Sequence, residues 1–150
     1  MDPICVFTDG ACRNNGKKNA KAGIGIYFGE NDDRNISERI SGKQTNNCAE
    51  LLAIIKVFDI LTSEIKQGTP VSIYSDSKYS IDCLTKWSQL WAQNNWRKPI
   101  KNKELIKHGY DLFQLYNNVT IFHIKAHTTN MDILSVGNRK ADYLANQSIL

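Results

Sequence analysis

The strongest constraint on the fold is a helical pattern of apolar residues between positions 47 and 61. Ala49, Leu52, Val57 and Leu61 are among the apolar residues that recur there at intervals of three and four. An asparagine precedes the pattern and suits a helix cap. A helix with one apolar face must pack against another layer, and the segments on both sides of it have the patterns of strands.

Three segments before this helix are typical of strands, at residues 4–8, 22–29 and 36–41. The connections between them are short, which predicts an antiparallel meander. In the second segment, glycines alternate with apolar residues, as they do where another backbone comes close.

Strands and helices alternate after the first helix. Strands are predicted at 71–76 and 119–127, and helices at 77–87 with an extension toward Asn95, at 102–116 and at 138–149. The helix at 102–116 would bury a stripe of Leu105, Leu112 and Leu115. This order predicts an α/β fold whose mixed sheet has an antiparallel half and a half of βαβ type.

Length and composition indicate one globular domain. The chain has 150 residues, of which 41% are hydrophobic and 23% charged. No apolar run is long enough to cross a membrane, and the first residues lack the features of a signal peptide. We therefore expect a soluble intracellular protein, with no membrane partner and a monomeric state as the default.

The four cysteines are far apart in the sequence and form no C-x-x-C pair. A zinc site or a disulfide framework is therefore not expected, and the thiols should be buried or half-buried. The net charge of +4 is mild, but basic residues gather at 13–21 and 97–107. Two such clusters indicate a polyanionic partner.

Four acids occupy places that are unusual when they are considered together. Asp9 and Asp76 are expected to end apolar strands, Glu50 shares the apolar face of the first helix, and Asp142 falls in the first turn of the last predicted helix. Singly, these acids have ordinary roles in turns, caps and helix ends. If they converge, four oxygen donors without cysteine suit Mg²⁺ or Mn²⁺, but spacing alone leaves the convergence open.

Five sequence motifs occur in the order known from one enzyme family. They are TDGAC (8–12), GKQTNNCAELLA (42–53), YSDSKY (74–79), HIKAHT (123–128) and GNRKADYLA (137–145). With these motifs the chain resembles the type 1 ribonuclease H family over nearly its full length. The resemblance implies a five-stranded mixed sheet flanked by α-helices, and residues 1–150 as a single catalytic domain without a separate hybrid-binding domain.

The resemblance also implies an activity, the endonucleolytic hydrolysis of the RNA strand of RNA/DNA hybrids, which leaves 3′-hydroxyl and 5′-phosphate ends. Two Mg²⁺ or Mn²⁺ ions would be held by Asp9, Glu50, Asp76 and Asp142, with Asp9 bridging both. His127 matches a mobile histidine that assists proton movement or product departure, and we expect the segment 127–138 to be a mobile loop.

Substrate contacts are carried over in the same way. Asn15, Asn46 and Asn47 match residues that grip the minor groove of the hybrid, where the 2′-hydroxyl distinguishes RNA from DNA. A pocket for a phosphate of the DNA strand is implied for Lys43, Thr45 and Asn102. Lys43 replaces the arginine of many relatives, which removes a bidentate donor.

Two further regions depart from the family pattern. Lys78 replaces the glutamine of some bacterial members, and its charge would contact phosphate near the cleavage point. A shortened handle would present Trp91 and Trp96 to the DNA strand, with its positive charge moved into the segment 97–103. The alternative role for the tryptophans, above all Trp87, is packing between helices.

Two other interpretations of the whole chain are compatible with the motifs. One is a hybrid-binding module without catalysis, which the retained acids disfavour because a carboxylate cluster repels phosphate. The other is the detached nuclease part of a reverse transcriptase polyprotein. A self-contained chain that begins with Met favours an independent enzyme over that reading.

Overall fold

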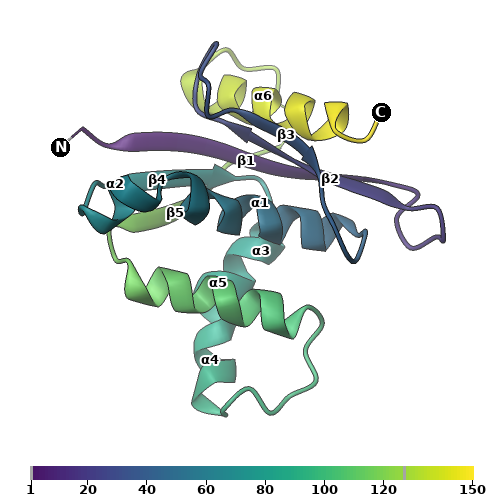
Figure 1. Ribbon diagram of the computed structural model, residues 1–150, viewed down its shortest axis with the longest axis vertical. Helices are drawn as coiled ribbons and strands as arrows, with labels where there is room; N and C mark the ends of the chain where they lie inside the picture. Colours follow the sequence, from purple (N-terminus) through teal and green to yellow (C-terminus); the bar gives the residue numbers. More distant parts are fainter. Residues whose placement is uncertain (1, 127) are drawn as a thin grey trace.

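The computed structural model describes residues 2–126 and 128–150. Its centre is a five-stranded sheet in the order β3-β2-β1-β4-β5 (Figure 1). β1 pairs antiparallel with β2, which pairs antiparallel with β3, whereas β4 pairs in parallel with both β1 and β5. The strands are β1 (Ile4–Arg13), β2 (Lys21–Tyr27), β3 (Ile36–Arg39), β4 (Val71–Ser75) and β5 (Val119–His123). The predicted mixed α/β sheet is confirmed.

Helices cover both faces of the sheet. α1 (Asn46–Ile60) lies between the sheet and α5 (Lys103–Leu115), while α6 (Ile133–Gln147) crosses the opposite face over β1 and β2 (Figure 1). A helical segment from residue 78 to 93 projects away from the sheet. It consists of α3 (Lys78–Asp82), the π-helical turn η1 (Cys83–Trp87) and α4 (Ser88–Gln93), and the short α2 (Thr62–Lys66) follows α1.

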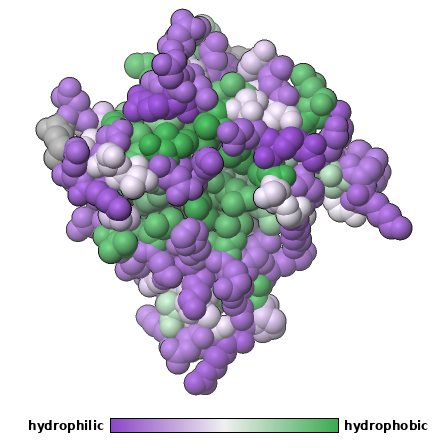
Figure 2. All heavy atoms as spheres, viewed as in Figure 1, coloured by the Kyte–Doolittle hydropathy of each residue, from purple (hydrophilic) through white to green (hydrophobic). Residues whose placement is uncertain are grey.

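The main core lies around α1. Leu51 and Ile54 of this helix are fully buried, as are Val6 and Ile73 on the central strands. On the face of the molecule drawn in Figure 2, apolar residues gather in the middle and hydrophilic residues lie toward the margins. In the described part of the chain, no helix is both long and apolar enough to cross a membrane.

The first strand is longer than predicted. β1 runs to Arg13 because its antiparallel partner β2 continues the register as far as the pair Arg13 and Lys21. Asp9 therefore lies in the middle of a strand, opposite Gly25, and the prediction that it ends the strand is wrong. The prediction of an asparagine cap for α1 is also wrong. Thr45 is the N-cap residue, and its hydroxyl accepts the N–H of Cys48 at 3.2 Å.

The last helix begins earlier than predicted. α6 starts at Ile133, where the Asp132 carboxylate accepts the N–H of Ser135 at 3.1 Å. Residues 133–138 are therefore helical rather than loop, and Asp142 lies well past the first turn. Gly137, expected to precede this helix, lies within it and is buried against the ring of Phe7.

Two smaller expectations also fail. Leu115 is 69% exposed and does not belong to the apolar face of α5, which packs through the fully buried Ile106. The four cysteines are free thiols, as expected, but Cys5 is exposed rather than buried or half-buried.

Gly25 marks a close approach between α6 and the sheet. A Cβ atom there would meet the Ala141 carbonyl oxygen and the Ala145 amide nitrogen, which are backbone atoms that cannot rotate away. We expect Gly25→Ala to lower the free energy of unfolding by about 1–3 kcal/mol, the usual range for overpacking. Gly29→Ala is the matched control in urea unfolding, because its Cβ would meet nothing within 4 Å. Equal unfolding midpoints for the two variants would contradict the close approach.

Candidate active site

Three of the predicted acids meet at the centre of the sheet. Asp9, Glu50 and Asp76 each offer an oxygen atom, and these atoms all lie within 4.8 Å of one another. The parallel pairing of β1 with β4 ends at the pair Thr8 and Ser75. The next residue in each case is an aspartate, Asp9 within β1 and Asp76 directly after β4, so the strand register brings these two carboxylates side by side.

Glu50 reaches the cluster because α1 lies directly on β1. Gly10 has no side chain, and a Cβ atom at this position would meet the backbone of Ala49 and Glu50. The Gly10 amide donates a hydrogen bond to Glu50 Oε1, and the hydroxyl of Ser77 also bonds the Glu50 carboxylate. Sequence reasoning missed both partners, although the glycine directly after Asp9 was a signal of close packing.

The cluster is electrostatically unfavourable as it stands. Asp9 and Glu50 are only 5% and 6% exposed. Burial raises the pKa of Asp9, and the charges of Glu50 and Asp76 raise it further. Burial also raises the pKa of Glu50, against the hydrogen bonds it accepts. Crowded carboxylates of this kind need a cation or protons, and an all-oxygen donor set fits a hard divalent cation.

Asp142 reaches the cluster from the other face of the sheet. Its side chain forms a hydrogen bond with Asp9. It is not one of the three mutually close acids, so the four predicted carboxylates form a triad with a fourth member joined through Asp9. His127 lies outside the described residues.

A polar cavity of about 290 Å³ lies at the N-terminal end of α1. Its walls include six of the predicted substrate contacts and two residues that were not assigned to the pocket, Gly16 and Lys101. The predicted residues are Asn15, Lys43, Thr45, Asn46, Asn47 and Asn102. Lysines and amide groups without a carboxylate make this cavity suited to an anion.

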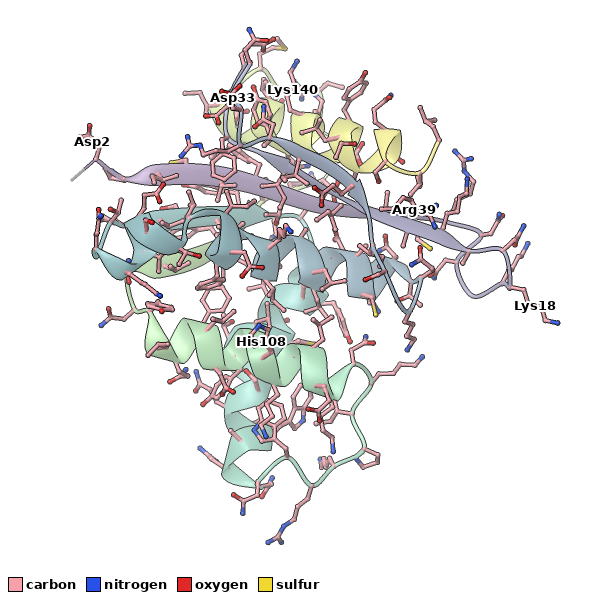
Figure 3. The ribbon with its side chains drawn as sticks, in the orientation of Figure 1. Asp2, Lys18, Asp33, Arg39, His108 and Lys140 are labelled. Atoms are coloured by element: carbon pink, nitrogen blue, oxygen red, sulfur yellow. The ribbon has the colours of Figure 1, made fainter. Side chains whose placement is uncertain are left out.

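Asn15 connects the β1–β2 turn to α1. Its Oδ1 accepts the backbone N–H of Asn46 at 3.1 Å, which leaves its amide N–H groups for other partners. Lys18, at the tip of the same turn, extends into solvent away from α1 (Figure 3).

The other predicted contacts lie on the α3–η1–α4 segment and the loop after it. The side chain of Lys78 is 75% exposed, and its Nζ lies 4.0 Å from Asp82 Oδ2. The ring of Trp91 lies between two other indoles, with its centroid 6.2 Å from that of Trp87 and 6.3 Å from that of Trp96, and is tilted against both. All three indoles are half-buried, so packing between helices takes part of their surface and leaves part of it to solvent.

Comparisons with known proteins agree on one family. The family model described as RNase H matches residues 1–149. The chain is 40% identical to a ribonuclease H of Schizosaccharomyces pombe, an alignment that covers 97% of this chain and 53% of that protein. It is 31% identical to a ribonuclease H of Clostridium botulinum, which covers 99% and 97% of the two chains.

Solved structures agree with the sequence comparisons. The solution structure of the RNase H domain of prototype foamy virus superposes with a TM-score of 0.74 at 26% identity, and covers 97% of this chain and 93% of that one. The chain spans about half the length of the fission yeast relative and of the mouse ribonuclease H1, of which it covers 50%.

Proposed function

The chain belongs to the ribonuclease H family, and on this premise we propose that it is an endonuclease that hydrolyses the RNA strand of RNA/DNA hybrids. The observation that carries the proposal is the buried triad of Asp9, Glu50 and Asp76. A module that only binds nucleic acid gains nothing from buried carboxylates that repel phosphate. The products would carry 3′-hydroxyl and 5′-phosphate ends.

We propose that the triad and Asp142 hold two Mg²⁺ or Mn²⁺ ions. Bound there, such ions lower the pKa of a water molecule and stabilise charge on the departing oxygen. The chain's own residues preorganise the site. The central strands fix Asp9 and Asp76, and the Gly10 amide and Ser77 hydroxyl hold the Glu50 carboxylate in one orientation. His127 remains a proposed aid to proton movement or product departure.

The polar cavity at the end of α1 would hold the substrate. Asn15, Asn46 and Asn47 carry amide groups that both donate to and accept from a ribose 2′-hydroxyl. Lys43, Thr45, Lys101 and Asn102 supply the cationic and hydroxyl groups that suit a phosphate of the DNA strand. Lys78 would contact phosphate near the acids.

The direct test is cleavage of a labelled RNA/DNA duplex in Mg²⁺ and in Mn²⁺. We expect cuts within the RNA strand, no cleavage of duplex DNA, and 5′-phosphate ends that allow ligation of the product. No cleavage in either metal would overturn the proposal. Cleavage of duplex DNA at a similar rate would overturn the assigned substrate.

The basic segment after α4 is expected to contribute electrostatic binding. Changing Arg97, Lys98 and Lys101 together to alanine should raise the KM for a hybrid and reduce its salt dependence. Each lost phosphate contact lowers the slope of log KM against log salt concentration by about 1. A matched triple variant of lysines on other surfaces, Lys56, Lys66 and Lys140, controls for net charge. If the slope of log KM against log salt concentration is the same in both triple variants, the segment after α4 does not contact the hybrid.

A further inference from the structure

The side chain of Asn102 belongs to a polar group that also contains two buried thiols and a phenol hydroxyl. Cys48 on α1 donates its S–H to Asn102 Oδ1 at 3.2 Å. Tyr79 on α3 forms side-chain hydrogen bonds with both Asn102 and Cys83. Cys48 is 6% exposed and Cys83 is 1% exposed. Four side chains from three parts of the sequence therefore form one connected polar group, and Asn102 joins this group to the wall of the cavity.

Each link in this group has a defined direction. Burial raises the pKa of Tyr79 to about 12, so its hydroxyl keeps its proton. That single proton goes to the sulfur of Cys83, and the Tyr79 oxygen then accepts an N–H from the Asn102 amide. The order of donors is Cys48 to Asn102, Asn102 to Tyr79, and Tyr79 to Cys83.

The side chain of Asn102 does not cap a helix. Asn102 occupies the N-cap position of α5, but its side chain makes no cap hydrogen bond. Its φ of 60° lies in the left-handed region, which asparagine tolerates better than most residues. The amide is instead held by α1 and α3 at the wall of the polar cavity.

We infer that Cys48, Tyr79 and Cys83 are positioning residues that fix the Asn102 amide with an N–H, and not its oxygen, toward an anion in the cavity. An asparagine amide can rotate by half a turn, and its oxygen would then repel a phosphate. With Oδ1 bound to Cys48 and one N–H bound to Tyr79, the second N–H is left for the ligand. The inference rests on the proposed function only for the identity of that ligand, a phosphate of the hybrid.

Steady-state kinetics on a hybrid substrate test the inference. Tyr79→Phe and Cys48→Ala should each raise KM about three- to tenfold, the effect of one hydrogen bond, with kcat changed less than twofold. Cys48→Ser keeps a donor at the same place and should retain a KM within twofold of the unmodified chain. Tyr116→Phe is the matched control, because this half-buried tyrosine packs on Phe58 in the core instead. Equal KM values for Tyr79→Phe and Tyr116→Phe would overturn the inference.

A double-mutant cycle separates positioning from general stability. If Tyr79 acts through Asn102, Tyr79→Phe should have no further effect on KM in the Asn102→Ala background. Additive effects of the two changes would show that Tyr79 acts by another route and would overturn the inference.

A titration with inorganic phosphate, followed by NMR, does not depend on catalysis. The side-chain amide signals of Asn102 should shift with phosphate in the unmodified chain, and Tyr79→Phe should weaken that binding by a similar factor. If the chain cleaves no hybrid but this result holds, the proposed function fails and the positioning role stands. Phosphate shifts that are equal in both proteins would overturn the positioning role, whatever the activity.

Discussion

Asp9→Asn is expected to slow hybrid cleavage by at least about 10³-fold, a loss of about 4 kcal/mol of transition-state stabilisation. Asp9 interacts with each of the other three acids, Glu50, Asp76 and Asp142. Asparagine has nearly the same shape but brings no charge to a cation. The loss should appear in the single-turnover rate at saturating substrate in Mg²⁺, while the Kd for the hybrid in EDTA should not weaken.

Two further variants define the specificity of this effect. Asp59→Asn removes an exposed acid at the far end of α1 and should cleave at the rate of the unmodified chain. Asp142→Asn should be slower than the unmodified chain but faster than Asp9→Asn, because Asp142 is outside the group of three mutually close acids and bonds to it through Asp9. An Asp9→Asn rate within tenfold of the unmodified chain would contradict the assignment of the site.

The order and type of the elements could be predicted because apolar periodicity is a local property. The pattern in residues 47–61 predicts both α1 and the unusual place of Glu50 on its apolar face. The alternating glycines of β2 likewise predict a close backbone approach, which α6 makes at Gly25. In each case the signal and the structural feature lie within one short segment.

The element boundaries depend on partners that are distant in sequence. The polar residues after Asp9 resemble a turn, but β2 supplies hydrogen bonds that extend the strand to Arg13. Ile133 is 81% exposed, so the first turn of α6 buries little apolar surface and lacks the periodicity that marks a helix start. The local sequence pattern therefore shows neither the pairing of residues 9–13 with β2 nor the helical first turn of α6.

The site is predictable in its residue types but not in its geometry. Asp9 and Asp76 become neighbours through the parallel register of β1 and β4, which no spacing in the sequence specifies. Cys48 and Asn102 are 54 residues apart, and their hydrogen bond has no counterpart in any local pattern. A buried cysteine looks the same in sequence whether it packs in a core or orients an amide.

Asp9→Asn is also expected to stabilise the metal-free chain, raising its Tm at pH 7 by roughly 5 °C, or about 2 kcal/mol. The pKa of Asp9 in the folded chain is raised above its ordinary value of 3.8 by burial and by the neighbouring acids. Between those two values the folded chain holds a proton that the unfolded chain has lost, so stability falls as the pH rises. Asparagine does not titrate, so the Tm advantage of the variant should be about zero near pH 4 and should keep growing as the pH rises toward the raised pKa of Asp9 in the folded chain. Thermal unfolding in EDTA across this range measures it.

In the presence of Mg²⁺, the unmodified chain should have a higher Tm than Asp9→Asn. A cation that binds only the folded chain raises its Tm in proportion to the logarithm of the free concentration, and this gain needs the Asp9 carboxylate. Asp59→Asn, the exposed control, should follow the unmodified chain within about 1 °C in both conditions. A metal-free Asp9→Asn that melts below the unmodified chain at pH 7 would mean that the carboxylate stabilises the fold as a turn or cap residue does. A Tm of Asp9→Asn that is higher than that of the unmodified chain without metal, and lower with Mg²⁺, indicates a buried charge that destabilises the metal-free fold and binds a cation.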